Sequence, residues 1–244
     1  TVNGTKMSKS RGTFIRARKF LEFLQPEYLR YYYAAKSGPS PEDIDLAAED
    51  FVNRVNAELV NTFATLVSRT ATFVVSTLDG KTCDFKPEDE EHLEFVRTKT
   101  KEAEACCRAF DLAGAVRCAV EVANLGNKLF QDAEPWKAVK TDPEAARHVV
   151  TRSLNFARAA AVLITPAVPS FGEAVYKICG LEDAPASFDE ATRFDLVNGG
   201  IGTPERLVER MDMKKFKALV EASKELTGPK PQDPPQGEEI DIDH

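Results

Sequence analysis

The sequence predicts a mainly α-helical protein, an antiparallel helical bundle preceded by a short basic segment. Apolar residues recur every three or four positions along most of the chain, as they do on a buried helix face. The loops between these segments are short, which favours antiparallel neighbours. There is no repeat of fixed period and no glycine-rich phosphate fingerprint. With 244 residues, of which 43% are hydrophobic and 29% charged, the chain can bury a sizeable core.

The N-terminal part is predicted to be a loop followed by two short helices. Residues 1–13 form the loop. Gln25-Pro26 interrupts the helical pattern that follows, and because proline favours the first position of a helix, a second helix is expected over 26–36. Within it, the helical spacing of Tyr31–Tyr33 favours core packing over an RNA-binding surface. Residues 37–41 have linker composition and mark the first boundary.

The longest periodic segment runs from about residue 47 to 77. Its apolar face is formed by Val52, Val55, Leu59, Phe63 and Leu66. Asn61, Thr65 and Arg69 fall four residues apart, and at the helical period they lie on the opposite face. They are therefore predicted to be exposed.

Capping residues and prolines predict the rest of the bundle. Asp111 and Asp142 are expected to cap two of its helices, and Glu134-Pro135-Trp136 forms a corner between these two. The predicted helices cover about 87–110, 112–131, 143–165 and 169–180. Residues 181–203 are predicted to be irregular and 204–210 to form a helical turn.

The chain is thereby divided into four parts. A segment over 1–40 carries the basic loop, and the helical bundle covers 41–211. A C-terminal helix occupies 212–227, and a proline-rich acidic linker occupies 228–244.

The net charge of −7 is unevenly distributed. Residues 1–36 carry eight Lys and Arg against two Glu, a charge of +6, so the remainder carries −13. A basic head fits a polyphosphate site. The acidic remainder argues against a broad basic face for nucleic acid, so that any RNA contact there is local.

Cysteine usage and hydropathy indicate a cytoplasmic protein. The five cysteines contain no C-x-x-C pair, which supports neither a zinc knuckle nor a disulfide framework, so reduced thiols and no metal site are expected. The longest apolar run, 157–169, is interrupted by Arg158 and Pro166, so no membrane span is predicted. No secretion signal core is found near the N-terminus.

The first residues contain the most informative motif, Lys6-Met7-Ser8-Lys9-Ser10. Two lysines three positions apart can converge on one polyanion, and the hydroxyls add neutral donors. Such a loop suits a triphosphate, on whose oxygens charge builds during displacement. The alternative for a pair of lysines alone is a solvated basic loop.

The five-residue string resembles the signature loop of class I aminoacyl-tRNA synthetases. Its continuation Arg11-Gly12-Thr13-Phe14 and the later Leu29-Arg30-Tyr31-Tyr32-Tyr33 resemble methionyl-tRNA synthetases most, and the likeness extends from Lys6 to about Glu225. It implies an enzyme that joins methionine to ATP, with Mg²⁺, and passes methionine from the adenylate to tRNA. Lys9 is then the lysine on the ATP phosphates.

The resemblance also assigns the other positions of the loop. Lys6 assists Lys9, and Ser8 and Ser10 shape the loop around ATP.

For the bundle, the resemblance implies an anticodon-binding domain that reads the CAU anticodon of tRNA(Met). Arg69 and Pro135-Trp136 stand where the family has a base-contacting arginine and a stacking pair. Thr65 replaces the family's asparagine and cannot offer the paired donor and acceptor of an amide, so Asn61, one turn earlier, is the candidate to compensate. Judged without the resemblance, Arg69 is a solvated charge, and Trp136 is equally consistent with core packing and with base stacking.

The sequence departs from the family in lacking a second, histidine-containing signature. Only His92, His148 and His244 are present, none in such a setting. The expectation is a fragment of a methionine–tRNA ligase. The fragment is expected to be inactive alone, and homodimerisation is expected to require a further C-terminal domain. The alternatives are another class I synthetase, a non-catalytic helical tRNA-binding module, and a purely structural bundle.

Overall fold

The computed structural model describes residues 1–8, 14–181, 184–196, 199–202 and 204–225. The mainly α prediction is confirmed, because β-structure in these residues is limited to isolated bridges. The helices are α1 (Ala17–Phe23), α2 (Pro26–Ala34), α3 (Ala48–Arg54), the π-helix η1 (Val55–Ala64), α4 (Thr65–Thr77), the 3₁₀-helix η2 (Pro87–Asp89), α5 (Glu90–Arg108), α6 (Leu112–Asp132), α7 (Pro135–Ala138), α8 (Pro143–Ile164), α9 (Pro169–Ile178), the 3₁₀-helix η3 (Phe188–Thr192) and α10 (Met213–Glu225).

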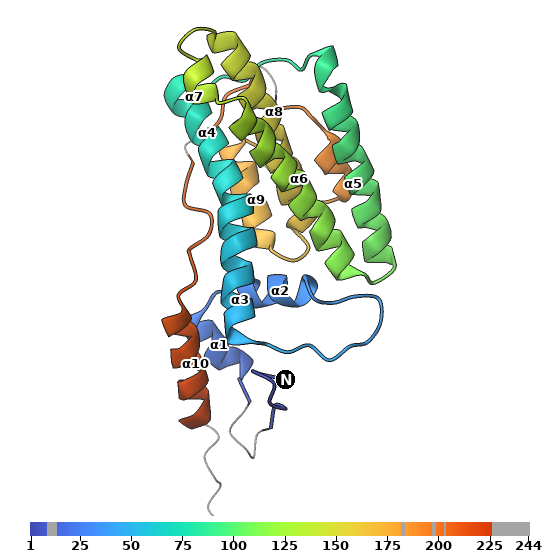
Figure 1. Cartoon of the computed structure of the whole chain (residues 1–244), viewed down its shortest axis with the longest axis vertical. Coiled ribbons are helices and arrows are strands. Elements are labelled where there is room, and N and C mark those ends of the chain that lie inside the picture. The colour runs from blue at the N-terminus through green and yellow to red at the C-terminus, as the bar shows by residue number, and fades with distance from the viewer. Residues whose placement is uncertain (9–13, 182–183, 197–198, 203, 226–244) are drawn as a thin grey trace, which may run out of the picture.

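Helix α8 lies at the centre of the bundle. Helices α4, α5, α6 and α8 run side by side along the long axis of the molecule (Figure 1), and α6 packs most extensively on α8. Every residue of Ser153–Ile164 is buried, as expected of a helix that other elements surround. The buried Arg158 guanidinium donates to the backbone oxygens of Glu190 and Arg193 and pairs with Asp195, so its charge is compensated.

The two predicted capping residues cap their helices. The Asp111 carboxylate accepts a hydrogen bond from the backbone N–H of Gly114 at 2.9 Å, at the start of α6. The Asp142 carboxylate accepts one from Ala145, also at 2.9 Å, at the start of α8. Each bond satisfies a backbone donor that has no partner within its helix, so these two helix starts follow from local sequence alone.

The long helix predicted over 47–77 contains a π-helix at its centre. The backbone N–H of Thr65 reaches the carbonyl of Val60, five residues back. The hydroxyls of Thr62 and Thr65 also donate to carbonyls five residues back, those of Ala57 and Val60, at 3.1 and 3.0 Å. Wide turns of this kind are rare and frequently occur at functional sites.

The prediction of a helical turn over 204–210 is wrong. Residues 204–211, here called the strap, form no helix and run alongside α4 and η1 (Figure 1). The buried Asn56 side chain exchanges two hydrogen bonds with the backbone of Met211, at 2.9 and 2.8 Å. The Tyr28 hydroxyl donates to the Glu209 carbonyl at 2.9 Å. Side chains of other elements therefore satisfy backbone groups that a helix would have paired internally.

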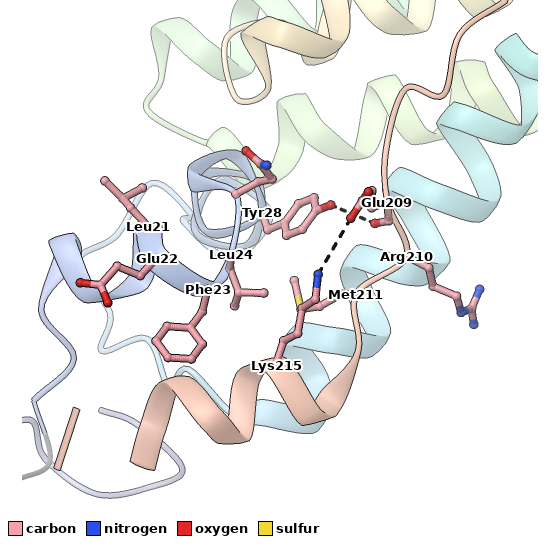
Figure 2. A pocket seen from close by; sticks show the side chains of 10 residues that line it. Leu21, Glu22, Phe23, Leu24, Tyr28, Glu209, Arg210, Met211 and Lys215 are labelled. Carbon is pink, nitrogen blue, oxygen red and sulfur yellow. Dashed lines mark hydrogen bonds and ion pairs between the residues drawn. The ribbon is translucent and has the colours of Figure 1, made fainter. Parts of the chain in front are cut away.

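The end of the strap meets α1, α2 and α10 around a pocket of about 160 Å³ (Figure 2). Lys215 of α10 lies 4.0 Å from the Glu209 carboxylate, on the side of the strap that faces this pocket. Arg210 points away from the pocket, and its Nη1 donates to Oδ1 of Asn61 at 3.2 Å. The last strap residues thus place Glu209 and Arg210 on opposite sides, as in any extended segment.

The N-terminal helices and α10 form a layer at one end of the bundle. Helix α10 packs on α1 and α3, and its Phe216 and Leu219 are buried. Tyr31 and Tyr32 of α2 are completely buried, which confirms the prediction that they belong to the core.

Replacing Asn56 by Ala should lower the free energy of unfolding by about 1–3 kcal/mol, because it leaves the backbone N–H and C=O of Met211 without partners. Urea unfolding followed by circular dichroism measures the change. Asn61→Ala is the matched control and should have little effect, since Asn61 is exposed and bonds only a side chain. An Asn56→Ala variant as stable as this control would show that the strap does not depend on the amide.

Candidate nucleic-acid interface

A backbone corner presents the only tryptophan of the chain. Glu134 adopts a left-handed conformation with φ 43°, and Pro135 begins α7 directly after it. The backbone N–H groups of Lys137 and Ala138 donate to the Glu134 carbonyl at 2.8 and 3.1 Å. Pro135 is buried, whereas Trp136 is 38% exposed. The corner thereby fixes the backbone and leaves part of the indole on the surface.

Phe130, at the end of α6, connects this tryptophan to Arg69. Its ring centroid lies 6.1 Å from that of Trp136, with the planes inclined by 40°. Arg69 belongs to α4, and its guanidinium carbon lies 4.3 Å from the centroid of the Phe130 ring, within the range of a cation–π contact. Arg69 and Trp136, 67 positions apart in sequence, therefore lie on one surface.

Asn127 of α6 holds the Arg69 side chain in place. The Nη2 of Arg69 donates to the Asn127 carbonyl oxygen, and burial lowers the pKa of Arg69, although a guanidinium remains protonated in proteins. The Asn127 side-chain amide donates to the Thr62 carbonyl at 3.0 Å, in the π-helix. One residue thus ties α6 both to η1 and to the arginine.

The predicted stripe of Asn61, Thr65 and Arg69 is only partly exposed. Asn61 and Thr65 are exposed as predicted, but Arg69 is half-buried because its guanidinium lies over Phe130. The Asn61 amide oxygen already accepts from Arg210, which leaves its N–H groups as the donors that a ligand can use.

The described residues of the predicted ATP loop, Lys6 and Ser8, lie at the other end of the molecule from the surface that carries Arg69 and Trp136. The N-terminal segment is found opposite α7 (Figure 1). Lys6 is exposed and Ser8 is half-buried, whereas Lys9 and Ser10 lie outside the described residues. Lys6 and Ser8 therefore lie on a different surface from Arg69 and Trp136.

The described part of the chain has no metal-binding cluster and no membrane span. No three His, Cys, Asp or Glu side chains within it are grouped to hold an ion. None of its helices is long and apolar enough to cross a bilayer. All five cysteines are free thiols.

Comparison with protein families decides where the chain belongs. The family described as the anticodon-binding domain of methionyl tRNA ligase matches residues 80–221, more than half of the chain. The chain belongs to this family. A second family, described as tRNA synthetases class I (M), matches residues 1–71. The resemblance to methionyl-tRNA synthetases is therefore confirmed, and the alternative of another class I synthetase is not supported.

Curated relatives agree with this membership. The methionine–tRNA ligase of Leptospira interrogans is 37% identical over 235 residues, which are 92% of this chain and 33% of that protein. The enzyme of Bdellovibrio bacteriovorus is 39% identical over 225 residues, which are 92% of this chain and 32% of that protein. The chain thus spans about a third of the length of these relatives.

Solved structures show the same fold. The methionyl-tRNA synthetase of Mycobacterium tuberculosis bound by methionyl-adenylate superposes with a TM-score of 0.74 at 23% identity. The match covers 84% of this chain and 42% of the other. The apo form of that synthetase gives a TM-score of 0.70 at 22% identity, over 79% and 40% of the two chains.

Two residues that organise the surface around Arg69 and Trp136 were not predicted from the sequence. Neither Phe130 nor Asn127 is among the site residues that the sequence predicts. The one signal for Phe130 is its place five residues before Pro135, at the end of a helix that leads into the corner. No sequence pattern indicates that the Asn127 carbonyl accepts from Arg69.

Replacing Phe130 by Leu should expose Trp136 further, because the phenyl ring covers one side of the indole. The emission maximum should move to longer wavelength, and acrylamide quenching should increase. Phe95→Leu on α5 is the matched control and should leave both unchanged. Equal quenching of the two variants would show that Phe130 does not support the indole.

Proposed function

We propose that this chain is the anticodon-reading part of a methionine–tRNA ligase and that its N-terminal loop serves the ATP site of that enzyme. The observation that carries the first half is the continuous contact from Arg69 through Phe130 to Trp136. An exposed aromatic plane beside a guanidinium is the arrangement by which proteins bind unstacked bases of single-stranded RNA loops. Phe130 packs against one side of the indole, 6.1 Å between ring centroids, and Pro135 fixes the start of the helix that carries it.

The donors and acceptors of Thr65 and Arg69 favour a base that carries an amino group. The Thr65 hydroxyl donates its only hydrogen to the Val60 carbonyl, so toward a ligand it can only accept. Arg69 offers donors only, and in the described part of the chain its Nη1 has no hydrogen-bond partner. Cytosine presents an amino donor beside acceptors on its pairing edge, which complements this pair. The pair therefore suits the first base of a CAU anticodon, with Asn61 adding amide donors.

At the other end, Lys6, Ser8, Lys9 and Ser10 are proposed to bind the ATP phosphates while methionyl-adenylate forms. Lysine is a mobile point charge that can follow the charge developing on a phosphoryl group. The loop contains no carboxylate, so these residues supply no ligand for Mg²⁺, which prefers oxygen ligands and often keeps substrate phosphates among them. Methionine and tRNA(Met) as substrates, a cytoplasmic location and a homodimer formed through a further domain belong to the same proposal.

Trp136→Ala should weaken binding of an RNA hairpin with a CAU anticodon loop about 5- to 150-fold, the equivalent of ~1–3 kcal/mol of lost stacking. Fluorescence anisotropy of a labelled hairpin at low salt measures the affinity. The matched control is Phe110→Ala, which removes another exposed aromatic ring at the turn between α5 and α6. Equal affinities of the two variants, or a large loss of thermal stability in Trp136→Ala alone, would favour a core role for the tryptophan.

Lys9→Ala in the full-length ligase should slow methionine-dependent ATP–pyrophosphate exchange about a hundred- to a thousandfold, the usual cost of removing one group that stabilises transition-state charge. Lys101→Ala, on the exposed face of α5, should leave the rate unchanged. A normal exchange rate in the Lys9 variant would exclude this lysine from the reaction.

A further inference from the structure

The predicted ATP loop begins directly after a tight turn of the backbone. The N–H of Val2 donates to the Thr5 carbonyl at 2.9 Å, and the N–H of Thr5 donates to the Val2 carbonyl at 3.0 Å. The two central residues, Asn3 and Gly4, are both left-handed, with φ of 47° and 73°. Left-handed torsions at both central positions are characteristic of a type I′ turn, for which Asn-Gly is a preferred sequence. Because Lys6 follows at once, the turn sets the direction in which the chain enters the loop.

The side chain of Asp45 holds this turn from the segment that precedes α3. Its Oδ1 accepts from the Thr1 hydroxyl at 2.6 Å and from the Gly4 backbone N–H at 2.9 Å. These hydrogen bonds, the one from Thr1 first, lower the pKa of Asp45, so the acceptor is ionised at neutral pH. An ionised acceptor makes the stronger kind of hydrogen bond. Asp45 is itself fixed by α2, because the hydroxyl of the buried Tyr32 donates to its backbone carbonyl at 2.8 Å.

Backbone pairing and the side chain of Asn3 complete the anchorage. The Leu46 N–H donates to the Thr1 carbonyl at 3.0 Å, and the Asn3 N–H donates to the Leu46 carbonyl at 3.3 Å. The Asn3 side-chain oxygen accepts at 2.9 Å from the backbone N–H of Ala48, the first residue of α3. An N–H at this position has no partner within its own helix. The turn before the loop is therefore attached to the start of the long helix.

A loop that binds ATP phosphates depends on such an anchorage. Charged groups stabilise a transition state only where its charge develops, and a misplacement of about 1 Å can slow a reaction about a hundredfold. We propose that Asp45 is a positioning residue for adenylate formation: it holds the Asn3-Gly4 turn and so directs the backbone that carries Lys6 toward the phosphates. This inference rests on the proposed function, since it assigns a support to the same ATP loop.

Kinetics of the full-length ligase test the role of Asp45. Asp45→Ala should lower kcat of methionine-dependent ATP–pyrophosphate exchange about ten- to a hundredfold per titrated active site. KM for ATP should change less than about threefold, because a misplaced loop fails mainly in the transition state. Asp45→Asn keeps an Oδ1 acceptor and should recover most of the rate. Asp43→Ala, on an exposed residue of the same segment, is the matched control and should leave kcat unchanged.

Two results of these measurements would overturn the proposal. The first is an Asp45→Ala enzyme whose kcat per active site equals that of Asp43→Ala. The second is an Asp45→Asn enzyme as slow as Asp45→Ala, since the two hydrogen bonds would then not be the reason for the loss.

Gly4→Ala disturbs the same turn without changing Asp45. A Cβ at Gly4 would meet no atom within 4 Å beyond its chain neighbours, so the substitution acts only through the left-handed backbone. Gly38→Ala is the matched control, because Gly38 has the same open space and no left-handed φ. Gly4→Ala should slow exchange, and combining it with Asp45→Ala should slow exchange little further, because both changes release one turn. Fully additive losses would show that Asp45 acts by another route.

Binding of the CAU hairpin separates a local change from loss of the fold. The surface around Arg69 and Trp136 lies at the other end of the molecule, so the Asp45 and Gly4 variants should bind the hairpin as the wild-type chain does. If Asp45→Ala does not fold, Gly4→Ala decides: slow exchange supports the proposal and a normal rate overturns it. If Lys9→Ala slows exchange and neither turn variant does, the inference fails and the proposed function stands. If Lys9→Ala is normal, both fail.

Discussion

The surface that carries Arg69, Phe130 and Trp136 depends on Asn127, through both its side-chain amide and its backbone carbonyl. Its side chain donates to the Thr62 carbonyl, in a stretch where the π-helix has shifted the backbone pairing by one residue. Its backbone carbonyl accepts from Arg69, which could otherwise extend into solvent as long cationic side chains normally do. The same residue therefore sets the register between α6 and the long helix and the direction of the guanidinium. The contact of Arg69 with Phe130 follows from these two bonds.

Much of the fold follows from local sequence. The starts of α6 and α8 are specified by aspartates that cap their own helices, and the prolines mark where α2 and α9 begin. The π-helix and the strap are different, because both depend on partners distant in sequence. Asn56 bonds Met211 across 155 positions, and no propensity of the strap residues indicates that pairing. Local sequence favours a helical turn over 204–210. The hydrogen bonds that Tyr28 and Asn56 make to the backbone of Glu209 and Met211 hold the segment extended instead.

In the candidate site, too, some features follow from local sequence and others depend on partners distant in sequence. Periodicity predicts that Asn61 and Thr65 are exposed, and they are. It also predicts a solvated Arg69, whereas the side chain is half-buried against an aromatic ring from another helix. The proximity of Arg69 and Trp136 could be expected only from the family resemblance. It is determined by how α4 and α6 pack, and the position of the two residues in the sequence gives no sign of it. Phe130, which joins them, has no distinguishing local pattern at all.

The backbone of the α7 corner has a consequence for the thermodynamics of any association. Glu134 holds a conformation that residues other than glycine rarely adopt, proline fixes the next torsion, and two hydrogen bonds to the Glu134 carbonyl close the turn. This rigidity exists before any partner arrives. A loop that had to become ordered on contact would lose ~1–2 kcal/mol of conformational entropy for each residue fixed. The backbone that carries the indole is instead preorganised, so a ligand that packed against Trp136 would lose less of its binding free energy to ordering the protein.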